Sequence, residues 1–370
     1  MTTATLARGH SVVLADATRA WRGGQRQVAL LARGLAARGI GVHVWTPRDS
    51  ALARVTARDG LPVTGPRHVR SDISVPAAWH LLATARRCGA TLVHAHDARA
   101  HAVARQAQLM GLAAPVVVTR RVTRVPLGRW KYRSGVTRYI AISAAVRRAL
   151  EAAGIPGTHV DVVPSAVPPP APAEVGAARG PLGLAPRESL LVAVTALTPE
   201  KGVETLVETA ATLAARGIRC RLVVAGEGPM RRRLEAHARA LGAPVRFIGQ
   251  AADPGPLLRA ADLMVHAPWT EGLGTAVLDA LARGLPIVAT RVGGIPEMVT
   301  AGVGSLVSPG NVEALADAVV GWLDRPERIE AARRAGPRIA ARFSIGRMVE
   351  GTLKTYATAV AATAYAPEGS

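Results

Sequence analysis

Two acidic residues eight positions apart mark the most informative segment of the sequence. Glu271 begins the run Glu-Gly-Leu-Gly-Thr, and Asp279 lies in the helix that this run is predicted to start. Gly272 and Gly274 would allow the backbone to approach a ligand closely. The N–H groups at the helix start, near Thr275, form a natural diphosphate site. Glu271 is placed to hold sugar hydroxyls, and the carboxylate of Asp279 can accept both hydroxyls of a ribose.

Lys201 is a second candidate, because it follows the first predicted strand of the second half of the chain. Its ammonium would present a compact positive charge to a diphosphate. In the first half, Gly23 and Gly24 follow the first predicted strand and begin a helix. A glycine pair in that position can cradle a phosphate or face a transferred sugar.

Two histidines end another predicted strand, in the run His94-Ala-His96-Asp97. His94 and His96 share one face of the strand, since side chains alternate with a period of two. His96 is nearer the strand end, so we expect it to reach a ligand and we interpret His94 as structural. Arg120 directly follows a predicted strand, so we expect it to lie near a ligand at the strand ends. The other basic residues of the run up to Arg133 do not have this position.

The elements that must position these residues alternate between strand and helix. Short apolar runs predict strands, and amphipathic runs between them predict helices. The predicted strands are 11–15, 41–45, 91–94, 115–119 and 139–142 in the first half, and 190–197, 221–225, 245–248, 262–267 and 286–290 in the second. Predicted helices include 25–38, 75–87, 202–216, 230–241, 275–283, 311–323, 328–342 and 345–364. This alternation predicts doubly wound parallel sheets, whose ligands bind beyond the carboxyl ends of the strands.

A proline-rich break separates the two halves. We predict an N-terminal domain over 1–167, a linker over 168–186, a second domain over 187–343 and a final helical segment over 344–370. A chain of 370 residues is long enough for two such cores.

Composition narrows the function classes. The 46 basic and 26 acidic residues give a net charge of +20, which favours anionic surroundings. No basic run interleaved with aromatics supports a nucleic-acid partner. Cys88 and Cys220 are too far apart to indicate a disulfide framework or a zinc site. Arg8 and His10 interrupt any signal-peptide core, and no run of ~18 apolar residues is present. We therefore expect a cytoplasmic protein, with possible peripheral contact to the inner face of an anionic membrane.

The segment from Glu271 to Thr290 resembles the E-x7-E signature of the family 4 (group 1) glycosyltransferases and its "xGxPIVAT" continuation. The second acid is Asp279 here, one methylene shorter. The resemblance implies a GT-B fold of two Rossmann-like domains facing across a cleft. It implies that 1–167 is the acceptor-side domain, that 187–343 binds the nucleotide sugar, and that the helix of 344–370 crosses back to the first domain. It also implies sugar transfer from an NDP-sugar with retention of configuration, no obligatory metal and no cofactor besides the donor. The resemblance further implies a glycan or lipid-linked acceptor, as in envelope polysaccharide or lipopolysaccharide synthesis.

The resemblance also assigns roles to residues. It places the catalytic groups at His96, Glu271 and Lys201. It places the donor diphosphate and sugar beside Gly23, Gly24, Gly272, Leu273, Gly274 and Thr275, and we add Arg120 to this group because of its position after a strand. It places the ribose and base beside Asp279, Gly226, Gly228 and Ile248.

One departure from the family pattern leaves alternatives open. The pattern G-R-x-x-x-x-K-G carries an arginine that holds the diphosphate, and this sequence has Ala196 in its place. Arg120, Arg121 or Arg22 could substitute for it. A non-catalytic nucleotide-sugar binder therefore stays an alternative, as does a sugar-nucleotide 2-epimerase, for which we find no convincing acid–base set.

Overall fold

The computed structural model describes residues 9–126, 132, 135–170, 179–185 and 187–364. The chain divides into two compact units. Unit 1 comprises Met1–Ala166 with Ile345–Ser370, and unit 2 comprises Val167–Ser344. The chain therefore passes from one unit to the other twice, and each unit is described by itself below.

Unit 1 is a seven-stranded sheet in the order β3-β2-β1-β4-β5-β6-β7, in which every pair of neighbours is parallel. The strands are β1 (Ser11–Ala15), β2 (Gly41–Trp45), β3 (Val63–Thr64), β4 (Leu92–Ala95), β5 (Val116–Arg120), β6 (Arg138–Ala141) and β7 (Val160–Val162). The helices are α1 (Gly23–Ala36), α2 (Ala51–Arg58), α3 (Val75–Arg87), α4 (Ala98–Leu109), α6 (Ala144–Ala152) and α13 (Ile345–Ala364). Parallel strands covered by helices explain why the strand sequences are almost wholly apolar.

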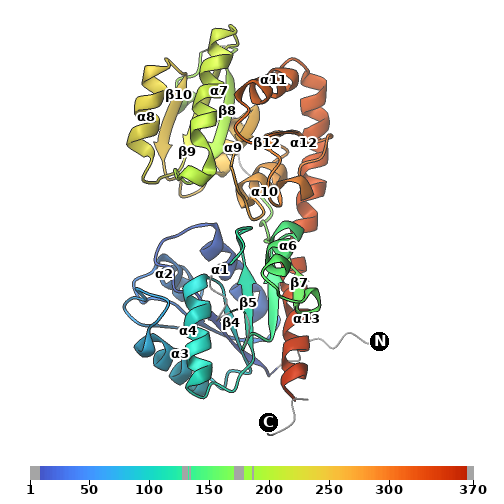
Figure 1. The fold of residues 1–370 in the computed structure, drawn as a ribbon. Coiled ribbons are helices and arrows are strands. Elements are labelled where there is room, and N and C mark those ends of the chain that lie inside the picture. The colour runs from blue at the N-terminus through green and yellow to red at the C-terminus, as the bar shows by residue number, and fades with distance from the viewer. Residues whose placement is uncertain (1–8, 127–131, 133–134, 171–178, 186, 365–370) are drawn as a thin grey trace. The chain divides into compact units, whose positions relative to one another are not determined.

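The final helix completes the core of unit 1. α13 packs against α1 (Figure 1), and Val349, Leu353 and Tyr356 join a buried cluster with Val12 and Leu14 of β1. A Cβ on Gly34 would lie 2.4 Å from Val349 Cγ2, so glycine allows the two helices to approach closely.

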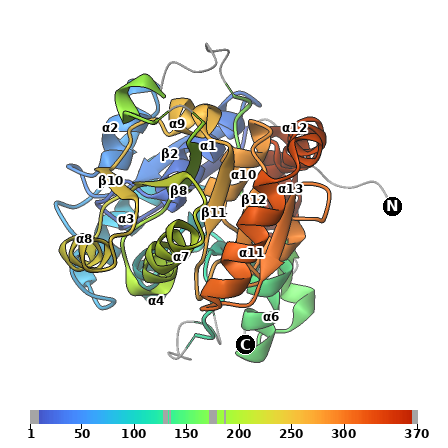
Figure 2. The ribbon, with the colours of Figure 1, turned by 90° about the horizontal axis from the view of Figure 1, so that it is seen from above.

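Unit 2 is a six-stranded parallel sheet in the order β10-β9-β8-β11-β12-β13. The strands are β8 (Ser189–Val194), β9 (Cys220–Ala225), β10 (Val245–Gly249), β11 (Leu263–His266), β12 (Ile287–Thr290) and β13 (Gly304–Val307). The helices are α7 (Val203–Ala215), α8 (Arg231–Ala240), α9 (Gly255–Ala260), α10 (Thr275–Ala282), α11 (Val312–Leu323) and α12 (Pro326–Ala340). α7 and α11 lie side by side (Figure 2), and α10 packs against α12.

The strands predicted from the sequence are all present, with bounds that shift by a few residues. The prediction did not name β3, β7 and β13, which lie at sheet edges and have at most four residues. Short edge strands carry little of the apolar pattern by which a strand is recognised. The segment 168–186, which we predicted to be a linker, contains a turn of 3-10 helix at Gly180–Leu182.

Candidate functional site

The candidate residues of both units lie where the strand order of a parallel sheet reverses. In unit 2 this point falls between β8 and β11, and in unit 1 it falls between β1 and β4. The connections from these strands leave in opposite directions, which opens a crevice beyond the carboxyl ends. Lys201 and Glu271 follow β8 and β11, whereas Gly23 and His96 follow β1 and β4.

Lys201 and Glu271 form an ion pair in unit 2, with Lys201 Nζ 2.7 Å from Glu271 Oε2. Lys201 ends the 3-10 turn Pro199–Lys201 that follows β8, and Glu271 lies in the loop between β11 and α10. Their side chains are 22% and 15% exposed, so both can still reach a ligand. The two residues that the sequence predicts to act on the donor are therefore in direct contact.

Glu271 is held as a carboxylate. Burial acts to raise its pKa, but the hydrogen bond with His266 and the charges of Lys201 and His266 outweigh burial and lower the pKa to about 2. His266 Nε2 lies 3.3 Å from Oε2, and the Gly272 N–H donates to Oε1 at 3.1 Å. His266 was not predicted as a site residue, although its position at the end of β11 was the available signal.

Two glycines bring the loops of this site together. A Cβ on Gly202 (φ +59°) would lie 2.0 Å from the Ala267 carbonyl oxygen. A Cβ on Gly293 (φ +54°) would lie 1.6 Å from the carbonyl oxygen of Glu271. Only glycine allows both the left-handed backbone and this close approach, so the loop of Glu271 is fixed from two sides.

The start of α10 has the geometry expected of an anion site. Gly274 (φ +99°) is the N-cap and, as a glycine, has no side chain to cap the first turn. The first turn carries no acidic residue, and Thr275 is partly exposed. Backbone N–H groups in such a turn attract negative charge. Gly272 and Leu273, in the loop that leads to this turn, are buried.

The residues assigned to the nucleotide have structural contacts of their own. Asp279 is 4% exposed, and Arg283 Nη1 donates to its carbonyl oxygen at 2.9 Å. A Cβ on Gly226 would lie 1.7 Å from the Thr195 carbonyl oxygen, and a Cβ on Gly228 would lie 2.3 Å from the Leu197 carbonyl oxygen. These glycines therefore allow the loops after β8 and β9 to pack closely. Ile248 is 38% exposed on β10. Contact of these residues with a nucleotide stays a prediction.

In unit 1, Arg121 lies against the start of α1. A Cβ on Gly24 would lie 3.5 Å from Arg121 Cδ, and Arg121 Nη2 donates to His96 Nδ1 at 3.3 Å. Burial lowers the pKa of Arg121 to about 10, so the guanidinium stays charged at neutral pH. The glycine pair leaves room for this arginine beside Gly23 and Gly24.

Arg120 takes a different direction from the one we expected. It donates to the Tyr132 hydroxyl at 2.7 Å and to the Arg124 carbonyl oxygen at 2.5 Å. Arg121, rather than Arg120, contacts the helix start. Arg129, Lys131 and Arg133 lie outside the described residues.

Two carboxylates act on Arg121. Asp97 caps α4 by accepting from the N–H groups of Arg99 and Ala100, at 2.8 and 2.9 Å. Asp16, fully buried after β1, accepts from Gln25 Nε2 at 3.0 Å. Burial and the charge of Asp97 raise the pKa of Asp16 to about 7, against the opposing effects of Thr18, Gln25 and Arg121. Asp16 was not predicted as a site residue.

A chain of buried polar groups links this cluster to α13. His94 Nδ1 lies 2.6 Å from the Tyr356 hydroxyl, and His94 Nε2 lies 2.7 Å from Thr119 Oγ1. The rings of His94 and His96 are 3.9 Å apart. Burial lowers the pKa of both histidines well below its usual value, so both rings are neutral. His96 is only 3% exposed, which differs from our expectation that it reaches a ligand directly.

We expect Asp16→Asn to change the pH dependence of stability. Because the pKa of Asp16 is higher in the folded protein than in the unfolded chain, the folded protein keeps this proton between about pH 4 and 7 while the unfolded chain loses it. The wild type should lose stability as pH rises through that window, and the variant should not. At pH 8 the variant should be about 4 kcal/mol more stable, because raising the pKa from 3.8 to about 7 costs about 1.4 kcal/mol for each pKa unit. Urea unfolding at several pH values measures this. The exposed control Asp49→Asn should follow the wild type, and a variant that also followed the wild type would contradict an elevated pKa.

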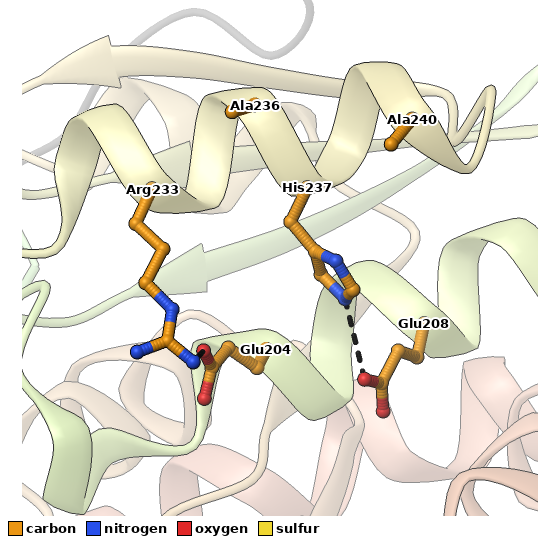
Figure 3. A pocket seen from close by; sticks show the side chains of 6 residues that line it. All are labelled: Glu204, Glu208, Arg233, Ala236, His237 and Ala240. Carbon is orange, nitrogen blue, oxygen red and sulfur yellow. Dashed lines mark hydrogen bonds and ion pairs between the residues drawn. The ribbon is translucent and has the colours of Figure 1, made fainter.

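A surface groove between α7 and α8 differs from the two sites at the strand ends. Figure 3 shows Arg233 and His237 of α8 pointing toward Glu204 and Glu208 of α7. The pairs lie at 2.9 and 3.2 Å, so Arg233 and His237 each already have a carboxylate partner. Residues of helices line this groove, rather than the loops that follow strands.

Within the ranges that the structure describes, His, Cys, Asp and Glu side chains do not gather in groups of three or more that could hold a metal ion. None of the helices in the same ranges is long and apolar enough to cross a membrane.

Two doubly wound parallel units, with the candidate residues at their strand ends, define an α/β protein of two Rossmann-like domains. The sequence matches the family described as Glycosyltransferase Family 4 over residues 21–169 and that described as Glycosyl transferases group 1 over residues 176–339. Together these matches cover most of the chain. The chain belongs to the family 4 (group 1) glycosyltransferases.

Curated relatives share part of their length with this chain. It is 36% identical over 173 residues to the GDP-mannose-dependent alpha-(1-6)-phosphatidylinositol dimannoside mannosyltransferase of Mycobacterium tuberculosis, covering 46% of this chain and 44% of that protein. It is 31% identical over 284 residues to the D-inositol 3-phosphate glycosyltransferase of Nocardia farcinica, covering 72% and 61%. The chain thus spans about half the length of the curated relatives that it matches.

Solved structures show the same fold. Anabaena HepE in complex with UDP and glucose matches with a TM-score of 0.81 at 20% identity, over 92% of this chain and 97% of that one. A glycosyltransferase from Rickettsia africae matches with a TM-score of 0.74 at 16% identity, over 94% and 98%. The fold is the GT-B fold of glycosyltransferases.

Proposed function

We propose that this protein is a glycosyltransferase that moves a sugar from a nucleoside diphosphate sugar to a hydroxyl of a glycan or lipid-linked acceptor. The observation that carries the proposal is the ion pair of Lys201 and Glu271 beside the uncapped start of α10. One group supplies positive charge for a diphosphate, and the other supplies a fixed carboxylate for sugar hydroxyls. Relatives named for GDP-mannose and a structure named for UDP and glucose support this donor class.

The proposed chemistry uses position and charge. The bond between the anomeric carbon and the diphosphate oxygen breaks while the acceptor oxygen bonds to that carbon, and the acceptor proton passes to the departing diphosphate. Lys201 and the N–H groups near Thr275 stabilise the charge that develops on the diphosphate. Glu271 orients the sugar. We propose retention of configuration and no metal requirement, so EDTA should leave the transfer rate unchanged.

We assign the acceptor to unit 1. Arg121 is a buried cation beside the glycines that start α1, and its charge suits a phosphate on the acceptor or on the donor. Relatives named for phosphatidylinositol dimannoside and for D-inositol 3-phosphate have phosphate in the names of their substrates. We propose a phosphorylated or lipid-linked acceptor of envelope synthesis, made on the cytoplasmic side of the membrane.

A panel of nucleoside diphosphates tests the donor site. Binding to the native protein stabilises it by about 2.7 kcal/mol at a hundredfold excess of ligand over Kd. We expect UDP or GDP to raise the thermal midpoint without added metal, and Lys201→Ala to abolish that rise. The matched control Lys354→Ala changes an exposed lysine of α13 and should keep it. No rise with any diphosphate would contradict the donor assignment.

Ala196 gives a specific reason to consider a non-catalytic nucleotide-sugar binder. That alternative predicts a thermal shift with a nucleoside diphosphate sugar but neither transfer nor slow hydrolysis of the donor. An assay for the released diphosphate, run on the protein that gives the shift, separates the two functions.

A further inference from the structure

Two side chains of unit 2 reach the same oxygen of Glu271. Lys201 Nζ lies 2.7 Å from Oε2, and His266 Nε2 lies 3.3 Å from it. A carboxylate only accepts hydrogen bonds, so both nitrogens donate. The other oxygen, Oε1, accepts the Gly272 N–H at 3.1 Å. Glu271 would therefore keep a donor at each oxygen even if one of the two donors at Oε2 left.

The two donors at Oε2 differ in how far they can move. The ammonium of Lys201 is at the end of a flexible four-carbon chain, and the side chain is 22% exposed. His266 is only 2% exposed and ends β11, which pairs with β8 on one side and with β12 on the other. Of these two donors, only Lys201 can therefore turn toward a ligand without movement of the backbone.

The second ring nitrogen of His266 indicates why a histidine is present at the end of β11. This atom, Nδ1, is buried and has no hydrogen-bond partner among the described residues. A buried polar atom without a partner lowers stability. The rest of β11 is apolar and buried, and an apolar residue in place of His266 would avoid that loss. The hydrogen bond to Glu271 is therefore what the histidine contributes here and an apolar residue would not.

We propose that His266 is a positioning residue that holds the carboxylate of Glu271 while Lys201 turns from it to the diphosphate of the donor. The inference rests on the proposed function, because it requires a diphosphate at Lys201. The diphosphate replaces the carboxylate as the partner of the ammonium. The His266 ring and the Gly272 N–H then hold one oxygen of Glu271 each.

This exchange leaves Glu271 both fixed and able to bind a sugar. Each carboxylate oxygen has two lone pairs, so each keeps one free lone pair beside its protein donor. The side chain of Glu271 is 15% exposed, so a ligand can reach these lone pairs. Two neighbouring hydroxyls of the donor sugar could then donate to one carboxylate whose position no longer depends on Lys201.

Binding of UDP or GDP, measured by titration calorimetry, tests the exchange. Glu271→Gln frees Lys201 from its ion pair and should bind the diphosphate about fivefold more tightly than the wild type. His266→Leu leaves the carboxylate with Lys201 as its main partner, so it should bind the diphosphate about fivefold more weakly. The double variant should bind like Glu271→Gln, because His266 acts only through the carboxylate.

The same double-mutant cycle tests the role in the reaction. The readout is kcat for release of the diphosphate from UDP-glucose or GDP-mannose, whichever nucleotide binds. His266→Leu should lower kcat about thirtyfold, the effect of losing a hydrogen bond to a charged group. In the Glu271→Gln protein the same change should lower kcat no more than about twofold. His266→Gln, whose amide nitrogen can take the place of Nε2, should recover at least about a third of the wild-type kcat.

Thr290→Val is the matched control for a purely structural effect. Thr290 is 1% exposed at the end of β12, and its Oγ1 donates to the carbonyl oxygen of Pro268 at 2.6 Å. It thus holds the same loop three residues before Glu271. Thr290→Val should lower the thermal midpoint, and its effects on affinity and kcat should be equal in the wild type and in Glu271→Gln.

Three outcomes would count against this role of His266. Equal losses from His266→Leu in the wild type and in Glu271→Gln would overturn it, since His266 would then act other than through the carboxylate. Diphosphate affinity that neither single variant changes would overturn the exchange. Failure of the wild type to bind UDP or GDP would overturn the proposed function as well. Binding without release would contradict only the proposed transferase, and the affinities would still decide the exchange.

Discussion

Glu271→Gln is expected to lower kcat about a thousandfold, the effect of losing a fixed charge that acts on a transition state. The wild-type carboxylate, whose pKa is lowered to about 2, is ionised throughout the physiological range. The amide keeps the size and one acceptor oxygen but removes the charge that pairs with Lys201 at 2.7 Å and faces His266 at 3.3 Å. Transfer measured with a saturating nucleoside diphosphate sugar gives kcat directly.

The matched control for Glu271→Gln is the same substitution at a carboxylate outside the site. Glu327 is exposed in the first turn of α12, so Glu327→Gln should retain full activity. Binding of the free diphosphate should survive in Glu271→Gln, because Lys201 is still present and the diphosphate carries no sugar for Glu271 to hold. A Glu271→Gln protein with more than about a tenth of wild-type activity would remove this residue from the chemistry.

Gly293→Ala should abolish activity and destabilise unit 2. The new Cβ would lie 1.6 Å from the Glu271 carbonyl oxygen, on a backbone with φ +54°, so the loop that carries Glu271 must move. Displacements of this kind cost several kcal/mol in stability, and a shift of about 1 Å at a site costs about a hundredfold in rate. Urea unfolding and the transfer assay measure the two effects separately.

Gly302→Ala is the matched control for this substitution. A Cβ at Gly302 would meet nothing within 4 Å among the described residues. This variant should match the wild type in both assays. If Gly293→Ala were as active as Gly302→Ala, the loop of Glu271 would not need the position that it holds here.

Much of the site in unit 2 could be predicted from the sequence, because its residues follow strands whose apolar runs are clear. The bounds of β11 and α10 lie close to those predicted, and the loop between them carries Glu271. His266 was missed because it ends β11 among apolar residues. The strand pattern does not show whether its side chain points into the core or toward the loop that carries Glu271. Its contact with Glu271 depends on how the loop folds back, which no local pattern specifies.

The cluster in unit 1 was predicted less well, and a single residue explains part of the difference. The strand predicted over 115–119 is Val116–Arg120 in the structure. Because side chains alternate along a strand, a shift of one residue exchanges the residues on its two faces. Arg121, not Arg120, therefore reaches Gly24. Tyr356 could not be predicted to contact His94 at all, since 262 residues separate them in the sequence.

Because His94 and Tyr356 are far apart in the sequence, the ribosome makes them at different times. A ribosome completes Val167–Ser344, all of unit 2, before it makes α13. Unit 2 can thus fold while the first 166 residues still lack Val349, Leu353 and Tyr356, and an emerging N-terminal segment must keep an apolar surface open until then. His94 gains its tyrosine partner only when residue 356 has been added. The contact between His94 and Tyr356 is therefore the last part of this cluster to form.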